Sequence, residues 1–143
     1  MTSVLQPEAL EARIRDARLR PTRQRKLVLA ALAAEPNDAT AQGIHRRLHA
    51  EGHPVGLATV YRALAALSER GVVDALSHRP GETCYRLCSD EHHHHLVCST
   101  CHRVVELPEC ELDPWVERMS ARHGFLAEEH RLEISGVCSS CRN

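Results

Sequence analysis

The chain has 143 residues, of which 26% are charged and only 3% aromatic, and its formal net charge is −1. This length allows one domain or two small ones, with cores built from aliphatic side chains. No apolar run approaches the about 20 residues that a membrane-spanning helix needs. The first residues have neither the basic nor the apolar region of a secretory signal peptide. We therefore expect a cytoplasmic protein without a membrane partner.

The charge is distributed unevenly along the chain. Residues 1–80 carry 12 basic and 8 acidic side chains, a net charge of +4, whereas residues 81–143 have a net charge of −5. All seven cysteines and seven of the eleven histidines also lie in the second segment. The first segment is thus suited to a polyanion, and the second is suited to cations.

The basic segment predicts four short helices followed by a β-hairpin. Apolar periodicity and capping residues predict helices over 8–17, from Thr22 to before Pro36, from Thr40 to before Gly52, and over 57–70. Strands are predicted over 72–76 and 83–87, with a turn over 79–82. This order of elements is typical of a winged helix, a variant of the helix-turn-helix.

The fourth predicted helix presents Thr59 and Arg62 away from its apolar face, with Tyr61 on the flank. An arginine in this position can contact guanine in the major groove, and a tyrosine or threonine can contact phosphate. Arg23 and Arg25 begin the second helix, where cationic side chains and a helix N-terminus meet phosphate. We therefore predict binding to double-stranded DNA. The alternative is a solvated face in an arginine-rich protein.

The second segment predicts a small α/β domain. Short strands are expected over 96–97 and 104–107, a helix over 112–123, and one strand over 125–135. The fold class is therefore α+β. We predict a DNA-binding domain over 1–80, a hinge over 81–88, and a domain over 89–143 that bound zinc holds together.

Two Cys-x-x-Cys pairs, Cys98 with Cys101 and Cys138 with Cys141, predict a tetrahedral zinc site of four thiolates. Such a site has no open coordination position, so it stabilises the fold and performs no chemistry. The alternatives are disulfides, which a cytosolic chain disfavours, and unligated buried pairs.

A run of four histidines lies just before the first pair. In extended backbone, residues i and i+2 point to the same side. His93 and His95 therefore share one face, while His92 and His94 share the other. One tract can thus serve two metal centres.

The first face has a thiolate and a carboxylate to complete it. Asp74 lies on the first hairpin strand and Cys88 just beyond the second, so that Asp74, Cys88, His93 and His95 make a mixed tetrahedral set. Thiolate with imidazole favours Zn²⁺ over Fe²⁺ or Mn²⁺. A metal here would tie the two halves of the chain together. The alternative is a solvated histidine-rich loop.

The second face needs partners from further along the chain. The candidates that accompany His92 and His94 are Glu111, Asp113 and His130. Histidine and carboxylate side chains are common on any protein surface. Two interpretations of this second face therefore remain, a metal site and an ordinary polar surface.

An enzyme is disfavoured. A zinc deaminase would need a His-x-Glu motif, but the histidine run continues into Leu96 and Val97. Neither cysteine pair has the setting of a thiol oxidoreductase. We expect no catalytic residue and no small-molecule substrate. Cys84 and Cys110 are assigned no role.

Four segments of the sequence resemble the Fur family of bacterial metalloregulators. They are LRPTRQRKLVLAAL, GLATVYRALAALSERGVV, HHHHLVCSTCHRVVEL and the closing EHRLEISGVCSSC, and the resemblance covers nearly the whole chain. The resemblance implies an N-terminal winged helix and a C-terminal α/β dimerisation domain. It also implies a metal-loaded homodimer that binds operator DNA and represses uptake genes, with Tyr61 and Arg62 as the main DNA contacts.

Within this family the chain most resembles the zinc-sensing members. The resemblance implies a structural four-cysteine site and a regulatory site of Asp74, Cys88, His93 and His95, hence two zinc ions per chain. A third site would use His92, His94 and His130, with Asp113 where relatives usually have Glu. His102 replaces the usual glycine after the second cysteine. An iron- or manganese-sensing member of the same family is the alternative.

Overall fold

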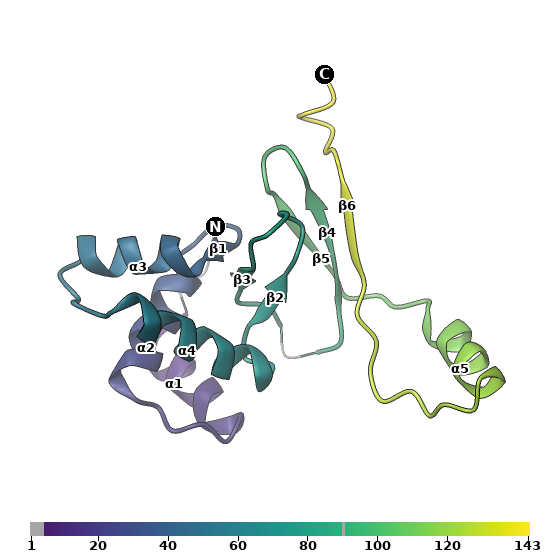
Figure 1. The fold of residues 1–143 in the computed structure, drawn as a ribbon, viewed down its shortest axis with the longest axis horizontal. Coiled ribbons are helices and arrows are strands. Elements are labelled where there is room, and N and C mark those ends of the chain that lie inside the picture. The colour runs from purple at the N-terminus through teal and green to yellow at the C-terminus, as the bar shows by residue number, and fades with distance from the viewer. Residues whose placement is uncertain (1–4, 90) are drawn as a thin grey trace. The chain divides into compact units, whose positions relative to one another are not determined.

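The computed structural model describes residues 5–89 and 91–143. It consists of two compact units, Met1–Asp90 and Glu91–Asn143 (Figure 1). The domain limits that the sequence suggested, with a hinge over 81–88, remain a prediction. Among the residues that the structure describes, no helix combines the length and the apolar character that crossing a membrane requires.

The first unit is a winged helix, as predicted. Its elements are α1 (Pro7–Asp16), α2 (Arg23–Ala33), β1 (Ala39–Thr40), α3 (Ala41–Ala50), α4 (Leu57–Glu69), β2 (Asp74–Leu76) and β3 (Cys84–Arg86). The two predicted threonine caps are present, because Thr22 Oγ1 accepts from Arg25 N at 3.3 Å and Thr40 Oγ1 accepts from Gly43 N at 3.0 Å. The sequence did not predict β1, which is too short to show an alternating pattern.

Aliphatic side chains from all four helices form the core of this unit. The fully buried ones include Ile14, Leu29, Ile44, Leu64 and Leu67. Beside this core lies an antiparallel sheet in the order β1-β3-β2. Cys84 is in its central strand, paired with Thr40 on one side and Leu76 on the other.

An arginine of α1 holds the chain segments that enter and leave the hairpin. Nη2 of Arg13 donates to the carbonyl oxygen of Cys88 at 2.7 Å and to that of Val72 at 3.5 Å. Hydrogen bonds from a charged donor to carbonyls are stronger than neutral ones. Arg13 therefore anchors the segment that leads out of the first unit.

The second unit contains β4 (His94–Cys98), β5 (Val104–Leu107), α5 (Asp113–Arg122) and β6 (Glu133–Gly136). The sheet order is β5-β4-β6, with β5 antiparallel and β6 parallel to β4. The prediction of one strand over 125–135 was wrong in extent. Only Glu133–Gly136 is opposite a strand, His95–Cys98 of β4, and a strand requires such a neighbour for its backbone hydrogen bonds.

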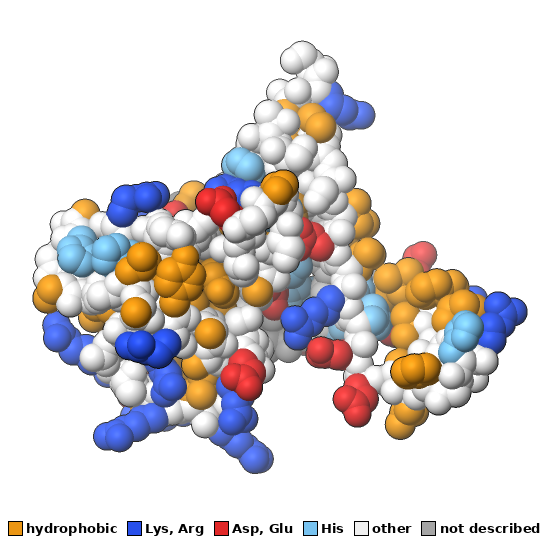
Figure 2. Space-filling model, viewed as in Figure 1, with side chains coloured by type: hydrophobic (Ala, Val, Ile, Leu, Met, Phe, Trp, Pro, Cys, Tyr) orange, Lys and Arg blue, Asp and Glu red, His pale blue; other side chains and the backbone are white. Residues whose placement is uncertain are grey.

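Large apolar side chains are exposed on the second unit (Figure 2). None of the residues of α5, all of which the structure describes, is buried. Trp115 is 54% exposed, Phe125 74% and Leu126 91%. An apolar patch of this kind marks a surface for interaction with another molecule.

His102 follows the first cysteine pair with a φ of 62°, in the left-handed region that favours glycine. Its N–H donates to the carbonyl oxygen of Cys98 at 2.9 Å, which closes the turn between β4 and β5. This conformation explains why a glycine suits the position.

Candidate metal centres and nucleic-acid surface

Four cysteines of the second unit converge at one end of its sheet. Cys98 ends β4 and Cys101 lies in the turn that follows, while Cys138 and Cys141 follow β6. The parallel register pairs Cys98 with Gly136, which brings the last pair beside the first. All four Sγ atoms lie within 4.8 Å of one another, with Cys101 and Cys138 at 3.8 Å. This spacing fits the edges of a zinc–thiolate tetrahedron.

The backbone around this cluster favours a thiolate. Backbone N–H groups of Cys101 and Cys138 lower the pKa of Cys98 to about 5, and Cys138 N donates to Cys98 Sγ at 3.4 Å. Its neighbours Cys138 and Cys101 raise the pKa of Cys141 to about 12. Four thiolates repel one another unless a cation lies between them, so this donor set fits Zn²⁺.

The histidine run divides as its alternation predicted. The rings of His92 and His94 contact each other with centroids 4.7 Å apart, and those of His93 and His95 with centroids 4.9 Å apart. The run therefore offers two separate pairs of imidazoles within the second unit.

The pair His92 and His94 belongs to a cluster with Cys110 and His130. Sγ of Cys110 lies 3.1 Å from Nε2 of His94 and 3.1 Å from Nε2 of His130. One ligand atom from each of the four residues lies within 4.8 Å of the others. Burial, followed by electrostatic interaction with His92 and His130, lowers the pKa of His94, which favours the neutral imidazole that binds metals.

Cys110 is the residue that the sequence analysis missed, because it had considered Asp113 and Glu111 for this position. Asp113 lies beside the cluster, with Oδ1 4.0 Å from Cys110 Sγ and 3.8 Å from His130 Nδ1. No recognised motif spacing connects Cys110 to the histidines. Only the path of the loop between β5 and α5 brings its thiol to them.

The residues of the predicted regulatory set are divided between the two units. In the first, Asp74 begins β2 opposite Arg86, and Cys88 lies where Arg13 holds its carbonyl oxygen. In the second, His95 lies in β4 beside His93. A site made of all four residues remains a prediction.

The predicted DNA-contacting side chains lie on α2 and α4. Tyr61 is 42% exposed, and Arg62 is also exposed, with Nη2 donating to Thr59 Oγ1 at 3.2 Å. Arg23 is exposed at the first position of α2, whereas Arg25 Nη1 donates to the carbonyl oxygen of Arg20 at 2.9 Å. Figure 2 shows Lys and Arg side chains along the edge of this unit.

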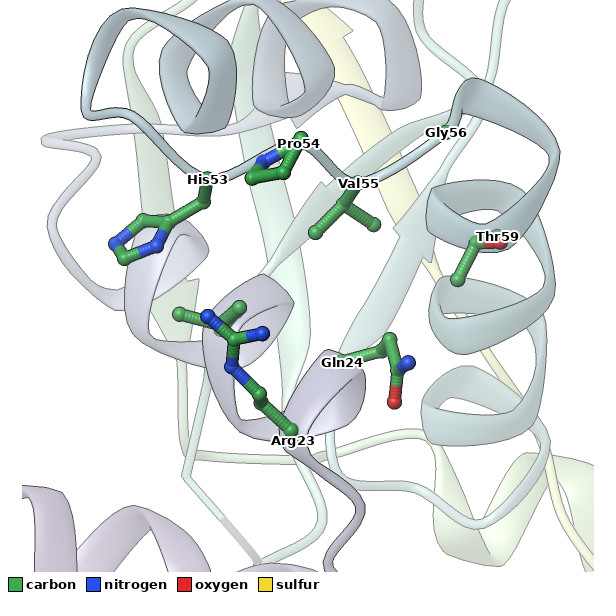
Figure 3. A pocket seen from close by; sticks show the side chains of 8 residues that line it. Arg23, Gln24, His53, Pro54, Val55, Gly56 and Thr59 are labelled. Atoms are coloured by element: carbon green, nitrogen blue, oxygen red, sulfur yellow. The ribbon is translucent and has the colours of Figure 1, made fainter.

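A cavity of about 130 Å³ lies between the N-termini of α2 and α4 (Figure 3). Arg23, Gln24, His53 and Thr59 line it, together with Gly56, the N-cap of α4, where no side chain caps the helix. A helix N-terminus without a side-chain cap, beside an arginine, suits a phosphate group.

A winged helix joined to a unit with clustered cysteines and histidines defines a metalloregulator. A comparison with family models matches residues 16–135 to "Ferric uptake regulator family". The chain therefore belongs to the ferric uptake regulator family, whose members are transcription regulators and not enzymes.

Curated relatives extend over almost the whole chain. It is 40% identical to the zinc uptake regulation protein of Mycobacterium tuberculosis over 127 residues, 89% of this chain and 98% of the relative. It is 34% identical to the ferric uptake regulation protein of Legionella pneumophila over 130 residues, 90% of this chain and 96% of the relative.

Solved structures share the fold. The ferric uptake regulator of Vibrio cholerae is 29% identical with a TM-score of 0.64, and the match covers 90% of this chain and 98% of that one. A zinc uptake regulator solved with zinc and DNA is 23% identical with a TM-score of 0.78, covering 96% of each chain.

Proposed function

We propose that this protein is a zinc-responsive repressor that binds operator DNA as a zinc-loaded homodimer and controls zinc uptake genes in the cytoplasm. The observation that carries the proposal is that each of the three candidate metal sets contains cysteine: the four-cysteine cluster, Cys110 with its histidines, and Cys88 in the predicted regulatory set. Thiolate with imidazole selects zinc over iron or manganese, which prefer oxygen-rich sets. The 40% identity to a zinc uptake regulation protein supports the same conclusion.

The regulatory set would couple zinc to the position of the DNA-binding unit. Asp74 and Cys88 would hold the ion from the first unit, and His93 and His95 from the second. A bound Zn²⁺ supplies a fixed crosslink. The four side chains would then restrict the two units to the arrangement that matches the operator, which is a population shift. A coupling of about 3 kcal/mol corresponds to an about 150-fold change in DNA affinity.

The exposed apolar side chains of the second unit support a homodimer. Trp115, Phe125 and Leu126, with Ile134 at 43% exposure on β6, offer a surface that a second copy of the chain can cover. Apolar burial of this kind is typical of obligate homodimers. A dimer presents two α4 helices and doubles the phosphate contacts.

The surface of the first unit supports DNA as the partner. Tyr61 and Arg62 are exposed on α4, and the cavity beside Arg23 and Gly56 suits a backbone phosphate. In this arrangement α4 reads base edges, while α2 and the α4 N-terminus fix the register on the phosphates.

The proposal is tested by titrating operator-type DNA binding with Zn²⁺, Fe²⁺ and Mn²⁺ at buffered free concentrations. We expect Zn²⁺ to switch binding at far lower free metal than the other ions. Cys88→Ser and His93→Gln should each abolish the switch and leave a folded dimer, whereas His123→Gln, at an exposed histidine outside the three sets, should leave it intact.

Switching by Fe²⁺ or Mn²⁺ instead, with Zn²⁺ without effect, would make the protein an iron- or manganese-sensing member of the family. Normal zinc switching by Cys88→Ser would remove Cys88 from the regulatory set.

A further inference from the structure

A fourth group of ligand-type side chains lies inside the first unit, where the proposed function does not use it. Asp38 precedes β1, His78 follows β2, and Cys84 begins β3. Nε2 of His78 lies 3.1 Å from Oδ2 of Asp38, and one ligand atom from each of the three residues lies within 4.8 Å of the others.

Strand pairing brings together the three chain segments that carry these residues. Cys84 pairs with Thr40 on one side and with Leu76 on the other. Asp38 and His78 each lie two residues from one of these partners and outside the paired residues, and the path of the chain before β1 and after β2 brings their side chains to Cys84. The convergence thus follows from the pairing of three separate segments.

The group is deeply buried, and its carboxylate lies beside the imidazole of His78 and the thiol of Cys84. The side chains of His78 and Asp38 are 0% and 1% exposed, and Cys84 is 0% exposed. Neither carboxylate oxygen of Asp38 accepts a hydrogen bond of good geometry from any described residue. A buried carboxylate is costly unless cations compensate its charge, and the guanidinium of Arg79, at 4.0 Å, is too far to donate a hydrogen bond to it.

We propose that Asp38, His78 and Cys84 form an additional divalent-cation site, with a preference for Zn²⁺, inside the winged-helix unit. One thiolate, one imidazole and one carboxylate match the ligand types that zinc takes, and three protein ligands leave one position for a water or a second carboxylate oxygen. The site is independent of the four-cysteine cluster and of the regulatory set, with which it shares no residue.

Two neighbouring features bear on binding. Burial, followed by the charge of Asp38, raises the pKa of Cys84 to about 11, so the thiol carries its proton at neutral pH and binding releases that proton. Nη2 of Arg79 lies 4.0 Å from Oδ1 of Asp38, on the side of the carboxylate away from the His78 contact. Oδ2 thus remains directed at the imidazole.

An ion at this position would tie the segment before β1 to the hairpin of β2 and β3. Asp38 lies two residues before Thr40, which caps α3, so the same ion would also fix the start of that helix. The hairpin is the wing of the fold. Metal would therefore order the wing within the first unit itself, whatever the state of the hinge.

The test measures zinc per chain by elemental mass spectrometry in the full-length protein, equilibrated with buffered Zn²⁺. The variants are Cys84→Ala and Asp38→Asn, and the control is Glu69→Gln, an exposed carboxylate at the end of α4 in the same unit. We expect each of the first two variants to contain one zinc ion fewer than the wild type, while Glu69→Gln keeps the full number. Wild-type zinc content in both variants would overturn the proposal and identify the group as a metal-free polar cluster.

A second measurement needs no variant. Crystals of the zinc-loaded wild type should show an anomalous difference peak at the zinc edge between Asp38, His78 and Cys84. The four-cysteine cluster serves as the internal standard. A strong peak there with none at Asp38 would also overturn the proposal, even if the variants fail to fold.

Discussion

Sγ of Cys110 lies 3.1 Å from Nε2 of His130, which is twenty residues further along the chain. The same sulfur lies 3.1 Å from Nε2 of His94 in β4. A thiol thus occupies the position between these imidazoles, and the carboxylate of Asp113 lies at its edge. This arrangement changes the expected chemistry of the third metal set from imidazole with carboxylate to imidazole with thiolate.

The first prediction compares these two residues as ligands. Cys110→Ala should lower the zinc affinity of the third set by more than about 100-fold, whereas Asp113→Asn should lower it by about 10–100-fold, because outer groups orient and tune the ligands. Competition of each full-length variant with a chromophoric chelator measures the affinities. A larger loss in Asp113→Asn than in Cys110→Ala would reverse the assignment.

The second prediction concerns pH and the metal-free protein. The pKa of Cys98 is lowered to about 5 from an ordinary value of 9.0, so folding favours its thiolate. The resulting stabilisation is complete above about pH 9 and is lost as the pH falls toward 5. The denaturant midpoint of the chelator-treated protein should therefore rise between pH 5 and 8, and Cys98→Ser should flatten that rise. Parallel curves for the two proteins would contradict the prediction.

The third prediction separates base contacts from phosphate contacts. Arg62→Ala should weaken operator binding by about 1–3 kcal/mol and relax its sequence preference, because an arginine on α4 reads base edges. Arg23→Ala should weaken the binding of operator and non-operator DNA about equally. It should also reduce the salt dependence of binding by the amount that corresponds to about one phosphate contact per chain. Fluorescence anisotropy at several salt concentrations measures both effects.

A matched control for these variants is Arg131→Ala, an exposed arginine of the second unit. Its DNA affinity should equal that of the wild type. If Arg62→Ala weakened specific and non-specific DNA equally, α4 would not be the reading helix.

The fourth prediction concerns the anchor on α1. Arg13→Met should destabilise the first unit by about 1.5–3 kcal/mol, because a charged donor loses its bonds to the carbonyl oxygens of Cys88 and Val72. Arg15→Met removes a salt bridge between the exposed Arg15 and the half-buried Glu11, with a nitrogen–oxygen distance of 2.6 Å, and should lower the free energy of unfolding by under about 1 kcal/mol. Thermal unfolding measures the stability of both variants. Equal destabilisation by the two substitutions would show that Arg13 does not anchor the segments at Val72 and Cys88.

The sequence alone predicted the features that depend on local pattern. Apolar periodicity and the caps Thr22 and Thr40 predicted the helices of the first unit, because these signals act within a single turn. The spacing of the cysteine pairs predicted the cluster of four sulfur atoms. Strand alternation predicted how the histidines divide, because that division follows from backbone geometry within four residues.

Only the tertiary structure decided the features that depend on distant segments. The path of the loop before α5 brings Cys110 to His94 and His130, and the path of the chain before β1 and after β2 brings Asp38 and His78 to Cys84. The short extent of β6 likewise depends on where its parallel partner β4 begins, because residues before Glu133 would lie opposite residues before His95. Such pairings depend on which chain segments become neighbours on folding, and no local period in the sequence records that choice.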